Sequence, residues 1–168
     1  MPGLASSTTK KVRVRFFDER RLDGYVSPQT YLRPNGAEIL DRSAQVHLIP
    51  YEQIRVIEFI REFEKAPPEN RRKVFAARPK SGGLWVRLHL RDGEVLEGIL
   101  PNDLLQVSDV GVVVTPPDPN SNTQRMFVPR AALSELKVLG VIGSPVRHRR
   151  PKKTPPDDQI ELFDKPGT

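Results

Sequence analysis

The chain has 168 residues, 37% of them apolar, so it can bury one ordinary core or two small ones. It contains no cysteine, which excludes disulfide bonds and thiolate metal sites. It has no run of 18 apolar residues and no apolar export signal. We therefore expect a cytoplasmic protein without a membrane span.

The formal net charge of +6 is unevenly distributed. Residues 1–60 carry +2 and residues 85–146 carry −2, so these two parts cancel. The excess lies in residues 61–84, with +4, and in residues 147–168, with +2. A nucleic-acid-binding fold usually shows its basic residues on the folded face. This distribution disfavours that function, although basic flexible arms also bind phosphates.

The first half of the chain has the pattern of short strands. Residues 1–10 are rich in Ser and Thr and are expected to be disordered. From Lys11 to Phe17 apolar and charged residues alternate, which predicts a half-buried strand. Gly24 predicts a bend or bulge in the next strand. Further strands are expected at 22–26, 37–40, 44–49 and 54–60, with a tight turn at 50–53. Residues 11–60 thus predict a first small β unit.

A basic linker is expected over residues 61–84. It contains Pro67-Pro68, the basic cluster Arg71-Arg72-Lys73 and the flexible run Ser81-Gly82-Gly83. The stretch from Glu69 to Ala77, after the prolines, is compatible with a short helix.

The chain then repeats its own pattern. Val86–Leu100 aligns without a gap with Val12–Val26, at an offset of 74 residues. Met126–Leu139 aligns with His47–Ile60 at an offset of 79 residues, with Pro129 over Pro50. Strands are expected at 85–90, 95–100, 111–115, 124–128 and 135–139. Residues 85–143 thus predict a second β unit, and the charged, Pro-rich residues 144–168 predict a disordered tail.

The chain resembles the Sm-like small β-barrel in its five short strands per repeat, its first hairpin with a glycine turn and the single turn before the last strand. Asp92, Gly93 and Gly98 fit that family's first motif, and Asp18 and Gly24 fit it in the first repeat. The end of the second unit is also similar to a bacterial family of unknown function with paired motifs. The resemblance implies a mostly β fold of two tandem Sm-like five-stranded barrels. It also implies that exposed strand edges pair with neighbours, within the duplicated chain or between copies.

An alternative function that this resemblance implies is RNA or DNA binding. Sm-like RNA binders carry an Asp and an Asn in the loop after the second strand, whereas the segment Asn102–Gln106 offers Asp103 and no Asn at the expected place. Arg130 stands where the second motif has a basic residue, but Glu52 in the other copy would repel phosphate. The residues that would bind nucleic acid are basic and lie mostly in the linker and tail: Arg71, Arg72, Lys73, Arg130, Arg147, Arg149, Arg150, Lys152 and Lys153.

No catalytic constellation is expected, so the protein is predicted to be no enzyme and to need no cofactor. His47, His89 and His148 are spread over both units and the tail, and His89 is expected to point to solvent, so a metal site is not predicted. No nucleotide-binding or nucleophile fingerprint is present. Four carboxylates are interpreted as turn and surface residues: Asp18, Asp92, Glu94 and Glu97.

Asp41-Arg42-Ser43 resembles part of the motif of the PilZ barrels, which bind cyclic dinucleotides. That family has a Gly three residues after its Ser, where this chain has Val46. A turn between two strands is the favoured interpretation.

The tail contains Gln159-Ile160-Glu161-Leu162-Phe163, which resembles the pentapeptide that docks bacterial DNA polymerases and repair proteins on the sliding clamp. In such a peptide Gln159 and Ile160 would meet the rim while Leu162 and Phe163 fill an apolar groove. A short strand on the protein's own sheet is the other interpretation of these residues. The leading hypothesis is therefore a non-enzymatic adaptor, with the barrels as a protein-binding scaffold and this motif as its linear partner site.

Overall fold

The structure is a computed structural model that describes residues 8–65, 71–103, 105, 107–118 and 120–143, and it is mostly β, as predicted. The first half forms β1 (Lys10–Phe16), β2 (Arg21–Val26), β3 (Leu32–Arg33), β4 (Gly36–Asp41), β5 (Val46–Ile49), the 3₁₀ turn η1 (Tyr51–Gln53) and β6 (Ile54–Ile60). The second half forms β7 (Gly83–Leu90), β8 (Val95–Leu100), β9 (Gly111–Val114), β10 (Thr123–Pro129), the 3₁₀ turn η3 (Arg130–Ala132) and β11 (Leu133–Ile142). Every strand expected from the sequence is present, with ends that differ by three residues or fewer.

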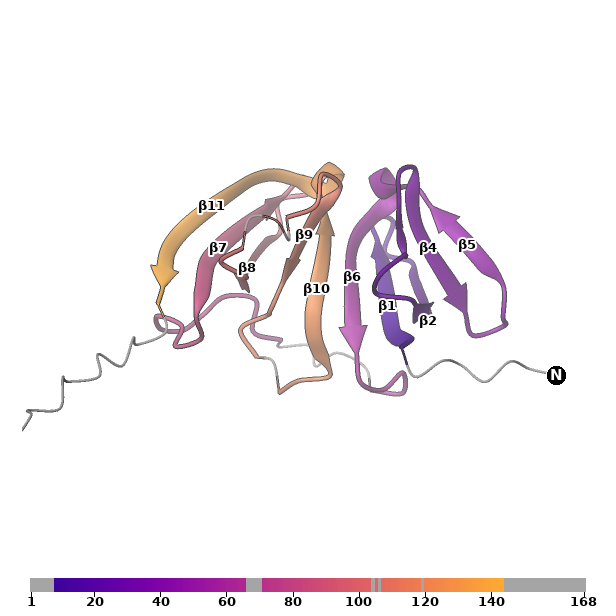
Figure 1. The fold of residues 1–168 in the computed structure, drawn as a ribbon, viewed down its shortest axis with the longest axis horizontal. Helices are drawn as coiled ribbons and strands as arrows, with labels where there is room; N and C mark the ends of the chain where they lie inside the picture. Colours follow the sequence, from indigo (N-terminus) through magenta and orange to yellow (C-terminus); the bar gives the residue numbers. More distant parts are fainter. Residues whose placement is uncertain (1–7, 66–70, 104, 106, 119, 144–168) are drawn as a thin grey trace, which may run out of the picture.

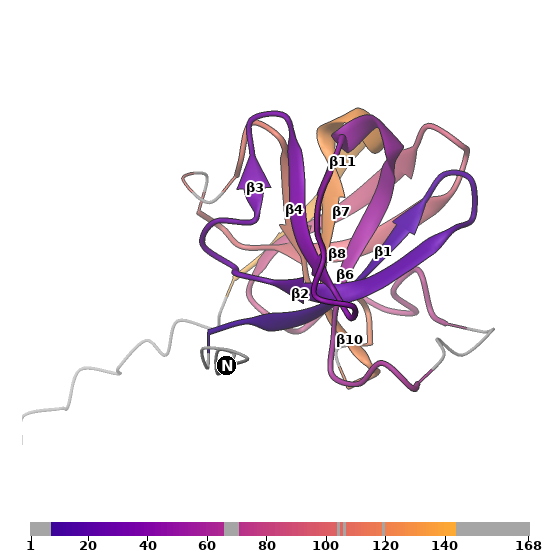
Figure 2. The same cartoon turned by 90° about the vertical axis from the view of Figure 1, so that its right-hand side faces the viewer.

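The two repeats have the same strand order. In the first, neighbouring antiparallel strands follow the order β5-β4-β2-β1-β6, and the short β3 also pairs with β4. In the second, β11, β7 and β8 form one sheet, and β9 pairs with β10. Ile99 and Thr115 connect β8 to β9 by exchanging two backbone hydrogen bonds of 2.9 Å. Both sets of strands curl strongly (Figures 1 and 2).

Gly24 and Gly98 lie where the second strand of each repeat passes close to the third. A Cβ atom at Gly24 would lie 2.4 Å from the carbonyl oxygen of Leu40. At Gly98 it would lie 2.8 Å from the Cβ atom of Val114. Because neither approach leaves room for a side chain, these glycines permit the curl that the sequence predicted at both positions.

Strand β6 joins the two repeats. It pairs with β1 along one edge and with β10 along the other, so the sheet of the first repeat continues into the second (Figure 1). In the antiparallel β6–β10 pair, Phe127 lies opposite Ile57 and Arg125 lies opposite Phe59. The edge strands of the two repeats thus satisfy each other's backbone hydrogen-bonding groups.

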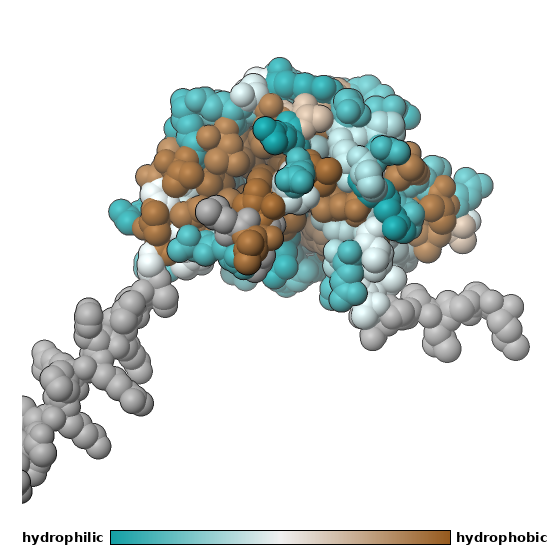
Figure 3. Space-filling model, turned by 45° about the horizontal axis from the view of Figure 1, so that its top comes forward, coloured by the Kyte–Doolittle hydropathy of each residue, from teal (hydrophilic) through white to brown (hydrophobic). Residues whose placement is uncertain are grey.

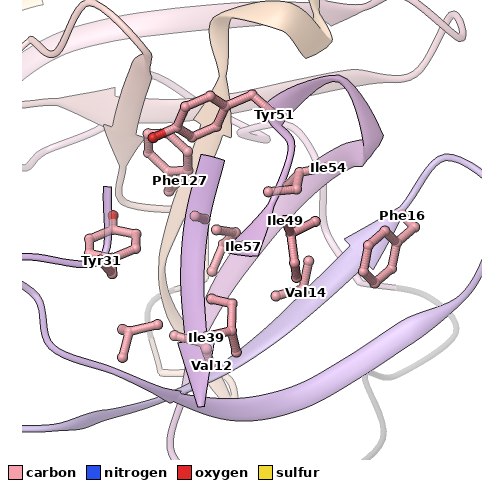
Figure 4. Close-up of a cluster of buried hydrophobic side chains, with 12 residues drawn as sticks. Val12, Val14, Phe16, Tyr31, Ile39, Ile49, Tyr51, Ile54, Ile57 and Phe127 are labelled. Carbon is pink, nitrogen blue, oxygen red and sulfur yellow. The ribbon is translucent and has the colours of Figure 1, made fainter. Parts of the chain in front are cut away.

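The repeats also exchange core residues. Phe127 of β10 is fully buried in the first core, near the rings of Tyr31 and Tyr51 (Figure 4). Val56 of β6 belongs to the second core, with Leu88 among others. Strands β6 and β10 therefore contribute side chains to both cores, one core on each face of the pair.

Candidate interaction surfaces

The linker lies against the second repeat. The backbone N–H of Glu97 donates to the carbonyl of Lys73 at 2.8 Å, and the N–H of Phe75 donates to the Glu97 carboxylate at 2.9 Å. The sequence is compatible with a short helix over Glu69–Ala77. This prediction is wrong for residues 71–77, the described part of the stretch, which form no helix. The reason is that alternate linker residues each contact the β body, which an extended chain allows and a helix does not.

Two of the basic linker residues predicted to bind nucleic acid form ion pairs with the β body. Arg71 contacts the carboxylate of Glu58 at 2.5 Å, and Glu58 is 1% exposed. Lys73 contacts Glu94 at 2.7 Å. The Lys73 side chain is still 53% exposed, and its neighbour Arg72 is exposed as well. The described part of the cluster therefore presents a smaller positive charge to solvent than its sequence suggests.

The sequence predicted Glu97 to be a surface residue. This prediction is wrong, because Glu97 is only 1% exposed. Its carboxylate accepts hydrogen bonds from Arg87 at 2.6 and 2.9 Å and from the Trp85 indole at 3.2 Å. Burial raises the pKa of Glu97, but the N–H of Phe75, Arg87 and Trp85 together outweigh it and hold that pKa below the usual value. Glu94 is likewise largely covered, with a side chain 7% exposed.

This carboxylate gives folding a pH dependence. Because folding lowers the pKa of Glu97, the ionised group stabilises the folded state above the ordinary carboxyl range, and this contribution is lost as pH falls through the folded pKa. We expect Glu97→Gln to cost about 1–3 kcal/mol at neutral pH. The cost should stay constant from pH about 7 to about 5 and shrink as the pH falls below about 4, in urea unfolding curves. Glu64, with a side chain that is 79% exposed, is the control, and an equal pH slope in Glu97→Gln and Glu64→Gln would contradict this role for Glu97.

Arg130 and Asp103 lie apart from the linker cluster. Arg130 begins η3 with an exposed side chain, and its backbone N–H donates to the carbonyl of Val110 at 2.8 Å. The carboxylate of Asp103 accepts the N–H of Leu105 at 3.0 Å. The other predicted residues, in the nucleic-acid set and the linear motif, lie outside the described residues: Arg147, Arg149, Arg150, Lys152, Lys153, Gln159, Ile160, Leu162 and Phe163.

The segment that resembles a PilZ motif is a turn. Asp41 ends β4, and its carboxylate accepts the N–H groups of Ser43 and Gln45 at 2.8 and 2.9 Å. The ring of His47 lies 2.7 Å from the other carboxylate oxygen. The N–H of Gln45 and the His47 ring lower the pKa of Asp41.

Apart from the two-residue β3, two strands in the described part of the chain leave an edge without a partner strand. β5 pairs with β4 alone, and β11 pairs with β7 alone. Figure 1 shows these strands at opposite ends of the body. Six of the ten large apolar side chains that the described part exposes belong to them: Val46, Leu48, Leu136, Val138, Leu139 and Val141. Apolar surface accordingly appears toward both flanks in Figure 3. These free edges are candidate sites for another β-strand.

An open hollow of about 710 Å³ lies beside the β5 edge. Its apolar wall includes Phe16, Leu22 and Leu48, and basic groups of Arg20 and Arg21 lie at the same hollow. This combination suits an extended segment that brings apolar side chains and a carboxylate.

The described residues lack both a metal-ligand cluster and a membrane-spanning helix. They contain no group of three His, Asp or Glu side chains that could hold a metal ion. They also include no helix long and apolar enough to cross a membrane.

A protein family described as a family of unknown function (DUF6982) matches residues 8–140. The match spans both repeats and the linker between them. No curated protein and no solved structure matches the chain.

Proposed function

This chain belongs to the family of unknown function DUF6982, and we propose that it is a non-enzymatic adaptor. Its β body is a protein-binding scaffold, and the tail segment Gln159–Phe163 docks on the bacterial sliding clamp. The observation that carries the proposal is that segment, because its residue types match the clamp-docking pentapeptide at every position.

The strand order supports an Sm-like scaffold. With the two-residue β3 left out, neighbouring strands follow the order β6-β1-β2-β4-β5 in the first repeat and β11-β7-β8-β9-β10 in the second. In both repeats the last strand along the chain therefore lies beside the first, and a 3₁₀ turn directly precedes that last strand. We propose that each repeat is a small Sm-like barrel and that the β6–β10 pair fuses the two. A scaffold of this kind offers strand edges to protein partners.

Charge pairing in the body favours protein binding over nucleic-acid binding. Arg71 and Lys73 are engaged with Glu58 and Glu94. Arg55 of β6 reaches across to Glu94 and, at 2.7 Å, to Asp92 of the second repeat. Because these cations already contact carboxylates, phosphate binding would have to compete with ion pairs that hold the fold together.

The linear motif has a physical basis for docking. Leu162 and Phe163 are large apolar anchors, and such residues contribute most of the binding free energy of short peptides. The motif begins 17 residues after Ile142, the end of β11. A separation of that length is long enough for the motif to reach a groove on a separate protein.

The test is calorimetric titration of the full chain into a bacterial sliding clamp. We expect micromolar binding that the variant Leu162→Ala/Phe163→Ala weakens at least about tenfold, since each anchor contributes about 1–2 kcal/mol. The control Asp157→Ala/Asp158→Ala changes two tail residues outside the motif and should bind like the unmodified chain.

Salt dependence separates this function from its alternative. Apolar docking on the clamp should change little between low and physiological salt. If the chain does not bind the clamp but binds RNA or DNA with an affinity that falls steeply with salt, nucleic-acid binding through the basic residues replaces the adaptor hypothesis.

A further inference from the structure

The two strands that join the repeats each have a counterpart strand in the other repeat, and these counterparts do not pair with each other within the described chain. Because residues 47–60 align with residues 126–139, β5 is the counterpart of β10 and β11 is the counterpart of β6. Within the chain, β6 and β10 pair with each other. Their counterparts, β11 and β5, each leave an edge without a partner strand in the described structure, and they lie at opposite ends of the body (Figure 1).

We propose that copies of this chain associate head to tail, with β11 of one copy paired antiparallel with β5 of the next. The contact reproduces the β6–β10 pair between molecules, and it is independent of clamp docking by the tail. Since two different edges meet, the interface is heterologous and generates a closed ring or an extended filament.

The register follows from the internal pair. The internal pair Arg125–Phe59 corresponds, at the offset of 79 residues, to Val46 of one copy opposite Val138 of the other. The internal pair Phe127–Ile57 corresponds in the same way to Leu48 opposite Leu136. All four of these counterpart residues are apolar and exposed, and Val46 and Val138 are 66% and 55% exposed. Pairing would bring apolar side chains together on one face, where cross-strand contacts stabilise a sheet.

The hollow beside β5 is the place that β6 fills in the second repeat. Arg20, Leu22 and His47 line this hollow. Their counterparts Glu94, Leu96 and Met126 line a small cavity together with residues of β6, Val56 and Glu58, and of the linker. Where β6 is seated, a space of only about 20 Å³ remains, against about 710 Å³ beside β5. A strand equivalent to β6 is therefore the occupant whose shape the hollow fits.

The charges also match β11 as that occupant. Glu135 is the counterpart of Val56, so it would enter a hollow that carries Arg20 and Arg21. Ser134 is the counterpart of Arg55, which neutralises Asp92 and Glu94 in the second repeat. The first repeat needs no such cation, because Asp18 is already paired with Arg20 at 2.6 Å. These two differences between β6 and β11 thus have complementary differences at the hollow.

The first test is the mass in solution of the full chain and two edge variants, by light scattering after size exclusion. The unmodified chain should exceed the mass of one chain, 19.0 kDa. Val46→Lys and Val138→Lys should each reduce the mass to that of one chain, because a desolvated lysine opposes strand pairing. The control Leu105→Lys, at a loop residue that is 96% exposed, should keep the unmodified mass.

Mixing the two edge variants tests the head-to-tail geometry. Val46→Lys retains an intact β11 edge and Val138→Lys retains an intact β5 edge, so the mixture should form a dimer of one copy of each. The proposal is overturned if the unmodified chain has the mass of one chain at every concentration, or if both variants still associate. It is also overturned if only one variant loses association, since that result means like edges pair with like.

Cysteine cross-linking tests the register. The chain contains no cysteine, so introduced thiols meet no competing ones. Val46→Cys mixed with Val138→Cys should form a disulfide-linked dimer under mild oxidation, and neither variant should do so alone. Val46→Cys mixed with Val141→Cys is the control on the same strand, three residues out of register. Equal cross-linking in both mixtures would exclude the proposed pairing.

Discussion

Replacement of Phe127 by alanine should lower the free energy of unfolding by about 3–5 kcal/mol, the usual cost of removing a buried phenylalanine side chain. The residue is 0% exposed and belongs to the first core although it lies on β10 of the second repeat. Its ring lies 6.0 Å from that of Tyr31 and 6.3 Å from that of Tyr51. The strands on either side of β10, β6 and β9, restrict the collapse of the resulting cavity, which keeps the cost high. A Tm about 10 °C lower is expected for a chain of this size.

The same variant tests whether the two repeats unfold as one unit. Trp85 is the single tryptophan of the chain and lies on β7 of the second repeat. Its fluorescence and the far-ultraviolet circular dichroism should shift by the same amount in urea, because the exchanged core residues couple both repeats. If the Trp85 transition stays in place while the circular dichroism shifts, the repeats unfold independently. Val74→Ala, at a side chain that is 43% exposed, is the control and should change stability by less than about 0.5 kcal/mol.

Local sequence patterns predicted most of the fold. The alternation in β1 and the matching Val86–Leu100 stretch marked half-buried strands, and Gly24 and Gly98 marked the bends. These signals are local, because strand periodicity and the room at a glycine are properties of a few neighbouring residues. The alignment of the two repeats extended each prediction from one half of the chain to the other.

The buried ion pairs could not be predicted from such patterns. Glu97 is a charged residue type, which usually faces solvent in a strand, yet the linker covers its face of β8. Its partners Arg87 and Phe75 come from another strand and from a linker without periodicity. The exchange of Phe127 into the first core is also invisible locally, because burial against the other repeat looks the same in sequence as burial against its own. A signal that was available is Glu97 in a strand that is otherwise apolar, with Glu94 directly before that strand, in a chain whose linker is basic.

Replacement of Arg71 by alanine should destabilise the fold by about 3 kcal/mol, because it leaves a buried carboxylate with a weaker partner. Glu58 lies on β6, the strand that joins the repeats, and is 1% exposed. Arg71 contacts it at 2.5 Å, while its other cation, Arg15, is 3.6 Å away. Arg72→Ala is the matched control from the same basic cluster, and its side chain is exposed, so its unfolding curve in urea should nearly coincide with that of the unmodified chain.

A double variant distinguishes two contributions to the stability lost in Arg71→Ala: the loss of the ion pair itself and the burial of an unpaired carboxylate. In Glu58→Met/Arg71→Met no charge is left unpaired, so most of the stability lost in Arg71→Ala should return, as it does when apolar residues replace buried ion pairs elsewhere. If Arg71→Ala unfolds at the same urea concentration as Arg72→Ala, the contact with Glu58 contributes nothing to the fold. The arginine would then be available to phosphates, and the basic cluster would regain the nucleic-acid role that its sequence suggested. A large loss confined to Arg71 assigns it instead to the junction between the repeats, where its charge compensates Glu58 and cannot serve a second partner without weakening the β6–β10 contact.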